Sequence, residues 1–479
     1  MEIESKTFKF KWNKENLELH CSKTTVEELK KDIFNQTKVH PDRQKLILKG
    51  KSLKDSDLIA NIPNGSLITL IGTADKDVVV SNKDNKVLFM EDLTKNERLQ
   101  LLKEKGEEEM FGLANLGNTC YFNSLIQAFG RVDKLKDELI KLFNNFGNNN
   151  NNNFVNQENM LSTHFCVELG RIYKMLSNTT ERLVPDKLVK LLRSLNPAFG
   201  DASGGYYKQQ DADECMILML DSLKQNLKQN KGNDNYADNL VDELFGISVN
   251  ITLTNIEDSS EVKKKIETSF KLVCYIEEKT NELVNGLKNS LEENVELFSD
   301  NLGRNTFFLK KQLINRLPPF LNIQFMRFFW KEANEDMFGS KAKKAKILKS
   351  VMFSKIIDVY DLCSPDVQEI LKLGRDIESK MLKEDKNYKT DLASQKKGDN
   401  MIPTGRYQLI AVVTHQGRSS EEGHYIGWTH KKEDKWSKFD DDIVTPQKTS
   451  DILELKGGGD WHMAYICIYQ ALEVPFQEV

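Results

Sequence analysis

Short stretches of alternating apolar and polar residues occupy the first 72 positions and flank one helical pattern. The alternation predicts strands over 7–12, 17–21, 45–48 and 66–71. Between the second and third of these, Val26, Leu29 and Ile33 recur at helical spacing, and Thr24 with Glu27 forms a capping-box pattern. We therefore expect a small independent unit over residues 2–73.

The chain from position 109 to position 472 mixes both periodicities and predicts one large α+β domain. Helical spacing follows Tyr121 and recurs over 165–176, 185–195, 216–223 and 367–384. Strands are predicted over 241–254, 270–275, 317–328, 406–413, 423–429, 435–442 and 461–469. The polar stretches 331–349 and 414–422 are predicted to be loops.

Three segments show no periodicity that could build a core. Residues 74–108 are charged and predict a flexible linker. Residues 144–153 are rich in Asn and predict a surface insertion, and residues 385–400 predict a mobile connection. We assign no chemistry to these segments.

Charge and cysteine content exclude several classes of function. The net charge of −4 gives no reason to expect nucleic acid as a partner, and no apolar run is long enough for a membrane span. The seven cysteines are scattered and never form C-x-x-C, which argues against a disulfide framework and against a cysteine zinc site. We expect an intracellular protein that is a monomer when free and has no metal or other cofactor.

The stretch 112–128, GLANLGNTCYFNSLIQA, combines a turn-prone first half with a helical second half. Cys120 therefore stands at the predicted start of a helix, where the macrodipole and the free backbone N–H groups favour a thiolate. Asn118 or Thr119 is available as the cap. A buried structural cysteine is the alternative, but a core position seldom needs such a loop.

A second cluster lies near the C-terminus, where His424 on one predicted strand is followed by Asp440 on the next. Adjacent antiparallel strands can bring two such residues face to face. Of the seven histidines, only His424 has both a preceding glycine and an acidic tripeptide on the next strand. The alternative for His424 is a core histidine with a satisfied hydrogen bond.

The polar stretch 204–214, GGYYKQQDADE, leads into an apolar helical face. On spacing alone, Asp211 is equally well explained as a helix N-cap.

Taken together, GLANLGNTCYFNS, QQDADE and GHYIGW with KFDDD resemble the ubiquitin-specific proteases over roughly residues 110–470. The resemblance implies a papain-like fold with a helical thumb and with a palm and fingers made of antiparallel sheet. It implies a deubiquitinase that hydrolyses the bond at the C-terminal glycine of ubiquitin. The zinc ribbon usual in the family is missing, so metal-free fingers are expected.

The resemblance also implies roles for particular residues. Cys120 is the expected nucleophile, His424 the base, Asp440 the residue that orients His424, and Asn115 the donor that stabilises the oxyanion. Asp441 is expected to point away from Asp440 if the segment stays extended. Positions that bind the ubiquitin tail in the family correspond here to Gln209, Asp211 and Tyr425.

The N-terminal unit, with PDRQKLILKGKSL over 41–53, resembles ubiquitin and its domain relatives. It lacks the Arg-Gly-Gly end, which implies a docking module that cannot be conjugated. Ile47 falls where this family carries its apolar recognition patch, although a core role is the alternative. Together, the module and the stretches LPPFLNIQFMRFF and GGGDWHMAY resemble the proteasome-associated branch of the proteases.

This resemblance implies an enzyme that trims ubiquitin from substrates at the 26S proteasome regulatory particle, in the cytoplasm and also in the nucleus. The loops 331–349 and 414–422 correspond to family loops that cover the cleft, so low activity in the free enzyme is expected. A catalytically weak ubiquitin-binding adaptor is the first alternative, and a cysteine protease with an unrelated substrate is the second. Linkage preference and phosphorylation of Ser419 or Ser420 stay open.

Overall fold

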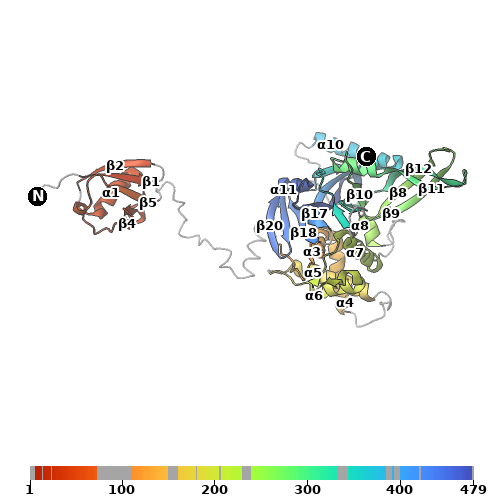
Figure 1. Cartoon of the computed structure of the whole chain (residues 1–479), viewed down its shortest axis with the longest axis horizontal. Coiled ribbons are helices and arrows are strands. Elements are labelled where there is room, and N and C mark those ends of the chain that lie inside the picture. The colour runs from red at the N-terminus through yellow and green to blue at the C-terminus, as the bar shows by residue number, and fades with distance from the viewer. Residues whose placement is uncertain are drawn as a thin grey trace, which may run out of the picture. The chain divides into compact units, whose positions relative to one another are not determined.

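The computed structural model of the chain describes residues 6–12, 15–22, 24–72, 110–148, 160–179, 181–203, 206–228, 239–331, 343–384, 391–392, 400–419 and 422–476. These residues form two compact units, one within 1–98 and the other within 99–479 (Figure 1). The predicted linker, residues 149–153 of the Asn-rich tract and most of 385–400 lie outside the described residues. Within the described part, no helix is long and apolar enough to cross a membrane.

The N-terminal unit is a β-grasp domain, as predicted. Its elements are β1 (Lys6–Trp12), β2 (Glu15–Cys21), α1 (Val26–Thr37), η1 (Pro41–Arg43), β3 (Lys45–Leu48), β4 (Lys51–Ser52), η2 (Ile59–Asn61) and β5 (Leu67–Ile71). The strands form one sheet in the order β2-β1-β5-β3-β4, in which β1 pairs antiparallel with β2 and parallel with β5. The apolar stripe of α1 packs on this sheet, with Leu29 and Ile33 in the same buried cluster as Phe8 and Phe10.

The helix α1 begins one residue later than its sequence pattern suggested. Thr25, and not Thr24, is the N-cap, and it exchanges side-chain and backbone hydrogen bonds with Glu28 instead of Glu27. The pattern at Thr24 is satisfied in another way, because the Thr24 N–H also donates to the Glu28 carboxylate at 3.0 Å. The capping box is therefore present but shifted by one position.

The outer face of the N-terminal sheet carries apolar side chains. Ile47 is half-buried, whereas its neighbour Leu46 is fully buried in the core. Ile47 pairs with Thr69 on β5, and on that same strand face Leu67 and Ile71 are 56% and 53% exposed. Cross-strand partners share a face, so these side chains form one outward patch. Ile47 is therefore part of the surface of this domain, and the alternative, a core role, is wrong.

The second unit combines helices and sheets as the sequence predicted. Its helices are α3 (Cys120–Phe129), α4 (Asp133–Asn148), α5 (Met160–Leu176), α6 (Asp186–Leu195), η6 (Pro197–Gly200), α7 (Ala212–Asn226), α8 (Leu240–Phe245), α9 (Leu283–Ser290), η7 (Tyr360–Leu362), α10 (Pro365–Glu384), α11 (Thr449–Leu453) and η8 (Glu454–Lys456). Helices α3 to α7, the thumb, lie together beside strands β17 and β18 (Figure 1). The helix α4 continues through residues 144–148, the start of the predicted insertion.

The strands of this unit form a palm and fingers. They are β6 (Ala202–Ser203), β7 (Tyr206–Tyr207), β8 (Ile247–Asn255), β9 (Val262–Ser269), β10 (Leu272–Tyr275), β11 (Glu292–Ser299), β12 (Arg304–Arg316), β13 (Phe320–Met326), β14 (Phe328–Lys331), β15 (Lys343–Lys346), β16 (Ile356–Asp358), β17 (Met401–Ser419), β18 (Glu422–Lys432), β19 (Lys435–Asp440), β20 (Ile443–Lys448) and β21 (Met463–Pro475). The palm sheet has the order β10-β13-β21-β17-β18-β19-β20, with β16 added to β17. The fingers sheet, β11-β12-β8-β9, projects from the palm (Figure 1).

Three predicted elements differ in kind from the structure. Residues 240–245, which include the start of the predicted strand 241–254, form the helix α8 because their apolar side chains fall at helical spacing. Asn239 caps this helix, and the strand β8 starts only at Ile247. The predicted loop 414–422 is largely the far end of the β17–β18 hairpin, with a bulge between Gln416 and Ser419. The predicted loop 331–349 begins and ends in the paired strands β14 and β15, and residues 332–342 lie outside the described residues.

Close packing of α3 on β18 connects the thumb to the palm. Gly427 on β18 faces Ser124 on α3, and a Cβ atom at Gly427 would lie 3.0 Å from the Ser124 carbonyl oxygen. The absence of a side chain therefore lets the helix backbone approach the sheet. This contact brings the N-terminus of α3, with Cys120, next to the strand that carries His424.

Candidate active site

The loop before α3 holds Cys120 at the first helical position, as predicted. Gly117 and Asn118 both adopt positive φ, at 85° and 53°, which turns the chain sharply before the helix. Thr119 is the residue that precedes the helix, but its side chain makes no capping bond. Its hydroxyl instead accepts a hydrogen bond from the Leu116 N–H at 2.9 Å, and its own N–H donates to Asn115 Oδ1 at 3.1 Å.

The Cys120 thiol is neutral in this structure. The side chain is only 2% exposed, and burial raises its pKa to about 12. The Tyr425 N–H donates to Sγ at 3.5 Å and opposes this rise, whereas the nearby Asp441 carboxylate adds to it. The prediction that the helix terminus favours a thiolate is therefore outweighed here by desolvation.

His424 and Asp440 meet across the neighbouring strands β18 and β19. His424 Nε2 and Asp440 Oδ1 are 2.7 Å apart, and Lys438 Nζ lies 3.0 Å from the other oxygen of Asp440. Partial burial alone would raise the pKa of Asp440, but the bonds from His424 and Lys438 outweigh it and lower that pKa below its usual value. An ionised Asp440 can only accept a hydrogen bond, so Nε2 of His424 carries the proton and donates it to this bond, which leaves Nδ1 as the free base nitrogen.

The residue after Asp440 turns back instead of continuing the strand. Asp441 has φ of 53°, so the segment is not extended and the predicted alternation fails there. Its carboxylate accepts hydrogen bonds from the side-chain amides of Asn115 at 2.9 Å and Asn123 at 2.8 Å. Its carbonyl oxygen accepts from the Leu113 N–H at 3.0 Å. The turn after β19 is thus fastened to the loop that precedes Cys120.

Asn123 is a site residue that the sequence pattern did not reveal. It lies within α3 and is 3% exposed, and its amide also donates to the carbonyls of Leu113 and Ala114. A polar Asn on the buried side of a helix is a signal that could have been noticed, because a buried amide needs partners. Asn115 is held at both ends of its amide, by Thr119 and by Asp441.

The residues predicted to bind a ubiquitin tail gather between the start of α7 and the palm. Asp211 is the N-cap of α7 and accepts from the Asp213 N–H, which agrees with the alternative interpretation of its position. Asp211 also accepts from the Tyr465 hydroxyl at 2.7 Å, and the Tyr465 ring lies 6.2 Å from the Tyr425 ring. Gln209 is 3% exposed, and within the described residues its Nε2 has no hydrogen-bond partner.

His415, on the other side of the hairpin from His424, has a different environment. It is fully buried, and burial lowers its pKa to about 2. Lys346 Nζ lies 2.8 Å from its Nδ1 and donates to its carbonyl oxygen at 2.7 Å, and burial lowers the pKa of Lys346 to about 7. His415 is therefore a neutral packing residue. Among the described histidines of this domain, the one bonded to a carboxylate is His424, whose partner is Asp440.

Among the described residues, the potential metal ligands His424, Asp440 and Asp441 lie within 4.8 Å of one another. Their carboxylates already accept bonds from His424, Lys438, Asn115 and Asn123. These interactions satisfy the carboxylate oxygens of the cluster within the protein itself.

A model of the ubiquitin carboxyl-terminal hydrolase family matches residues 111–469 of the chain. The chain belongs to this family. A model of the ubiquitin family matches residues 7–74, so a ubiquitin-like domain precedes the hydrolase domain. The protein is thus a cysteine deubiquitinase of the ubiquitin-specific protease type.

Several relatives match the chain over both its ubiquitin-like domain and its hydrolase domain. The chain is 34% identical to ubiquitin carboxyl-terminal hydrolase 7 of Arabidopsis thaliana, over 97% of this chain and 98% of that protein. It is 30% identical to ubiquitin carboxyl-terminal hydrolase 14 of Caenorhabditis elegans, over 96% and 92% of the two chains. It is 28% identical to ubiquitin carboxyl-terminal hydrolase 6 of Schizosaccharomyces pombe, over 94% and 95%.

Proposed function

We propose that this deubiquitinase acts on conjugates bound at the proteasome, and that the ubiquitin-like domain is its docking module. The observation that carries the proposal is the apolar outer face of that domain, where Leu67 and Ile71 are more than half exposed beside Ile47. Apolar patches of this kind mark interaction sites on soluble domains. The resemblance of the two domains together to the proteasome-associated branch supports the proteasome as the partner. The enzyme then works in the cytoplasm and the nucleus.

We assign the thiol chemistry to Cys120 and His424. Nδ1 of His424 takes the proton of the thiol, and the sulfur attacks the carbonyl carbon of the terminal glycine of ubiquitin. The C–N bond then breaks, the imidazolium returns its proton to the leaving lysine amine, and water hydrolyses the resulting thioester. Asp440 holds the imidazole in the required tautomer through its bond to Nε2 at 2.7 Å.

The oxyanion that forms in this step is stabilised by Asn115 and the Cys120 N–H. The amide nitrogen of Asn115 has two hydrogens, and its bond to Asp441 uses one of them. The second hydrogen is available to the substrate oxygen. Asp441 and Asn123 thereby act as positioning residues for the oxyanion loop.

The extended tail of ubiquitin binds beside Gln209, Asp211 and Tyr425. An unpaired buried amide costs free energy, about 1–3 kcal/mol, and a backbone carbonyl of the tail would satisfy Gln209 Nε2. All three side chains are buried in the free enzyme. The tail therefore needs an opening between α7 and the palm, and this agrees with low activity that docking relieves.

The test is covalent labelling by ubiquitin with an electrophilic C-terminus, with and without purified proteasome. A Cys120-dependent adduct that forms faster with proteasome supports the proposal. Equal rates under both conditions would remove the link between docking and activity. Binding of ubiquitin without any adduct would instead support the second candidate, a catalytically weak adaptor. The observation that favours this candidate is the buried, neutral thiol of Cys120.

A further inference from the structure

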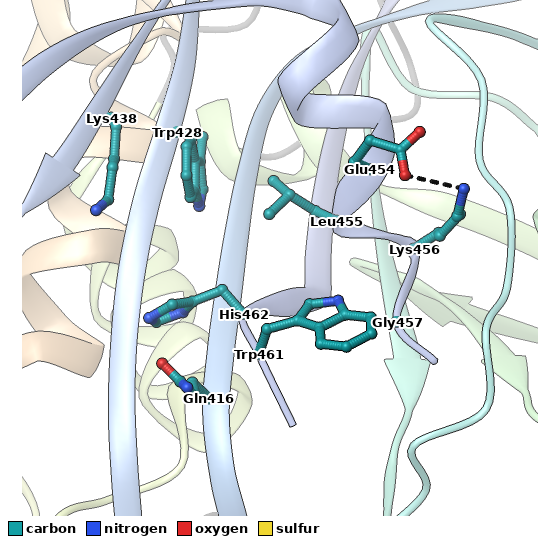
Figure 2. Close-up of a pocket in the computed structure, with 9 residues that line it drawn as sticks. All are labelled: Gln416, Trp428, Lys438, Glu454, Leu455, Lys456, Gly457, Trp461 and His462. Atoms are coloured by element: carbon teal, nitrogen blue, oxygen red, sulfur yellow. Dashed lines mark ion pairs between the residues drawn. The ribbon is translucent and has the colours of Figure 1, made fainter. Parts of the chain in front are cut away.

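A cavity of about 410 Å³ adjoins His424 and Asp440 on the palm. Figure 2 shows the residues that line it. Trp428 and Lys438 extend from the neighbouring strands β18 and β19, and Gln416 and His462 lie below them. Leu455 and Trp461 line the side near the turn that follows η8. Apart from Lys438, which pairs with Asp440, none of these side chains has a role in the proposed chemistry.

Three of the lining residues contact the His424–Asp440 pair or its strand. Lys438 Nζ lies 3.0 Å from Asp440 Oδ2, and the ring centroid of His462 lies 5.9 Å from that of His424. Gln416 is the cross-strand partner of His424. The cavity therefore lies beside the imidazole that protonates the leaving amine, one layer of side chains away.

The cavity and the candidate tail site lie on opposite faces of β18. Side chains alternate along a strand, and Gly427 faces α3 while the Tyr425 N–H contacts Cys120. Trp428 points to the other face, where Lys438 lies over its ring at 5.8 Å. A ubiquitin tail bound beside Tyr425 leaves the cavity free for a different part of the substrate.

The charges in the cavity wall are already paired. Lys438 is held by Asp440, and Lys456 forms an ion pair with Glu454 at 3.0 Å, which Figure 2 marks at the rim. What the wall offers is apolar surface, above all the indole of Trp461, which is 51% exposed. Exposed tryptophans beside a pocket are typical anchors of protein recognition.

The turn that presents Trp461 depends on glycine and on a buried cation. Gly457 and Gly458 have φ of 94° and 102°, and a Cβ atom at Gly459 would lie 1.8 Å from the Trp461 ring. Arg327 is fully buried and donates to the carbonyls of Lys456 and Ala464, before and after this turn. The glycine turn and the hydrogen bonds of Arg327 therefore fix the position of the indole.

We propose that this cavity binds an apolar side chain of the leaving polypeptide, within a residue or two of the lysine from which ubiquitin is removed. The inference rests on the proposed function, because the lysine amine must lie against His424 to receive its proton. The chain on either side of that lysine then passes the mouth of the cavity. Trp461 is the expected specificity-determining residue.

The experiment uses the full chain and three substrates. One is ubiquitin ethyl ester, whose leaving group is too small to reach the cavity. The others are ubiquitin joined by an isopeptide bond to the central lysine of a fluorescent peptide, flanked by leucines or by glycines. We expect the leucine peptide to have about tenfold higher kcat/KM than the glycine peptide, because an anchored side chain contributes about 1.4 kcal/mol.

In Trp461→Ala this preference should disappear, while kcat/KM for the ester changes by less than about twofold. Gly459→Ala, which displaces the indole without removing it, should reduce the preference. Ile370→Ala, an apolar residue on α10 that is 53% exposed, is the matched control and should retain it. A wild-type enzyme without preference, a Trp461→Ala variant that keeps it, or equal losses on ester and peptides would overturn the inference. Failure of the wild type to hydrolyse the ester would instead overturn the proposed function.

Discussion

The carboxylate of Asp441 accepts a hydrogen bond from the side-chain amide of Asn115, 326 positions earlier in the chain, at 2.9 Å. The bond joins the turn after β19 to the loop before α3. The same turn begins at Asp440, which binds His424. One short segment therefore orients both the candidate base and the candidate oxyanion donor.

Asp441→Ala should lower kcat about tenfold and change KM little, because Asn115 loses the partner that fixes its amide. Direct removal of an oxyanion donor costs more, about 100-fold to 1000-fold. Asp441→Asn should recover part of the loss, since its amide oxygen can still accept from Asn115. Hydrolysis of ubiquitin ethyl ester measures both constants.

Asp442→Ala is the matched control for this acidic tripeptide, because Asp442 pairs with Arg182 instead of with the cysteine loop. It should leave kcat within about twofold of wild type. An Asp441→Ala variant that raised KM alone would show that Asp441 acts in binding and not in the chemical step.

Alkylation of Cys120 by iodoacetamide should rise about tenfold per pH unit between pH 7 and pH 10, without a plateau. A raised pKa means that deprotonation occurs at higher pH, so with a pKa of about 12 only ~0.0001 of the thiol is ionised at pH 8. Mass spectrometry of the Cys120 peptide follows the rate. A plateau below pH 8 would mean that the free enzyme holds a thiolate paired with His424.

Ile47→Arg should abolish co-sedimentation with the proteasome, because a charge in the apolar patch must be desolvated on docking. Adduct formation with electrophilic ubiquitin in the absence of proteasome should stay unchanged. Leu58→Arg, at a position of the same domain that is 51% exposed and lies outside the patch, serves as the control. Loss of binding in both variants would indicate that any added charge on this domain interferes.

Gly427→Ala should destabilise the enzyme by about 1–3 kcal/mol and also reduce activity, because the added Cβ meets the α3 backbone at Ser124. Displacing α3 also moves Cys120 relative to His424. Thermal unfolding and the rate of adduct formation give the two effects. Gly303→Ala, where nothing lies within 4 Å of the new Cβ but φ is 67°, measures backbone strain without a steric contact and should leave the rate of adduct formation unchanged.

Much of the site could be predicted from local patterns. The start of α3 at Cys120 follows from a turn-prone loop before a helical stripe, and the meeting of His424 with Asp440 follows from two adjacent strands. Both features depend on short-range periodicity. The same holds for the four main strands and the helix of the β-grasp unit, in which the cap of α1 is shifted by one residue.

The remaining features depend on contacts that local periodicity does not specify. Asp441 was expected to point away from Asp440, but its positive φ reverses the chain, a conformation that a non-glycine residue seldom adopts. Asn123 falls at an ordinary helical position, and only its distant partner Asp441 gives it a role. The burial of Cys120, which decides its protonation, depends on how the palm packs over the thumb.

The guanidinium of Arg327 also has a consequence for motion. Besides the carbonyls of Lys456 and Ala464, it donates to those of Ile347 and Lys349, which follow β15. Its pKa, although lowered by burial to about 10, keeps it charged at neutral pH, so release of any one segment would leave a buried cation short of acceptors. The amide hydrogens of these three segments should therefore exchange with deuterium together, as one cooperative unit.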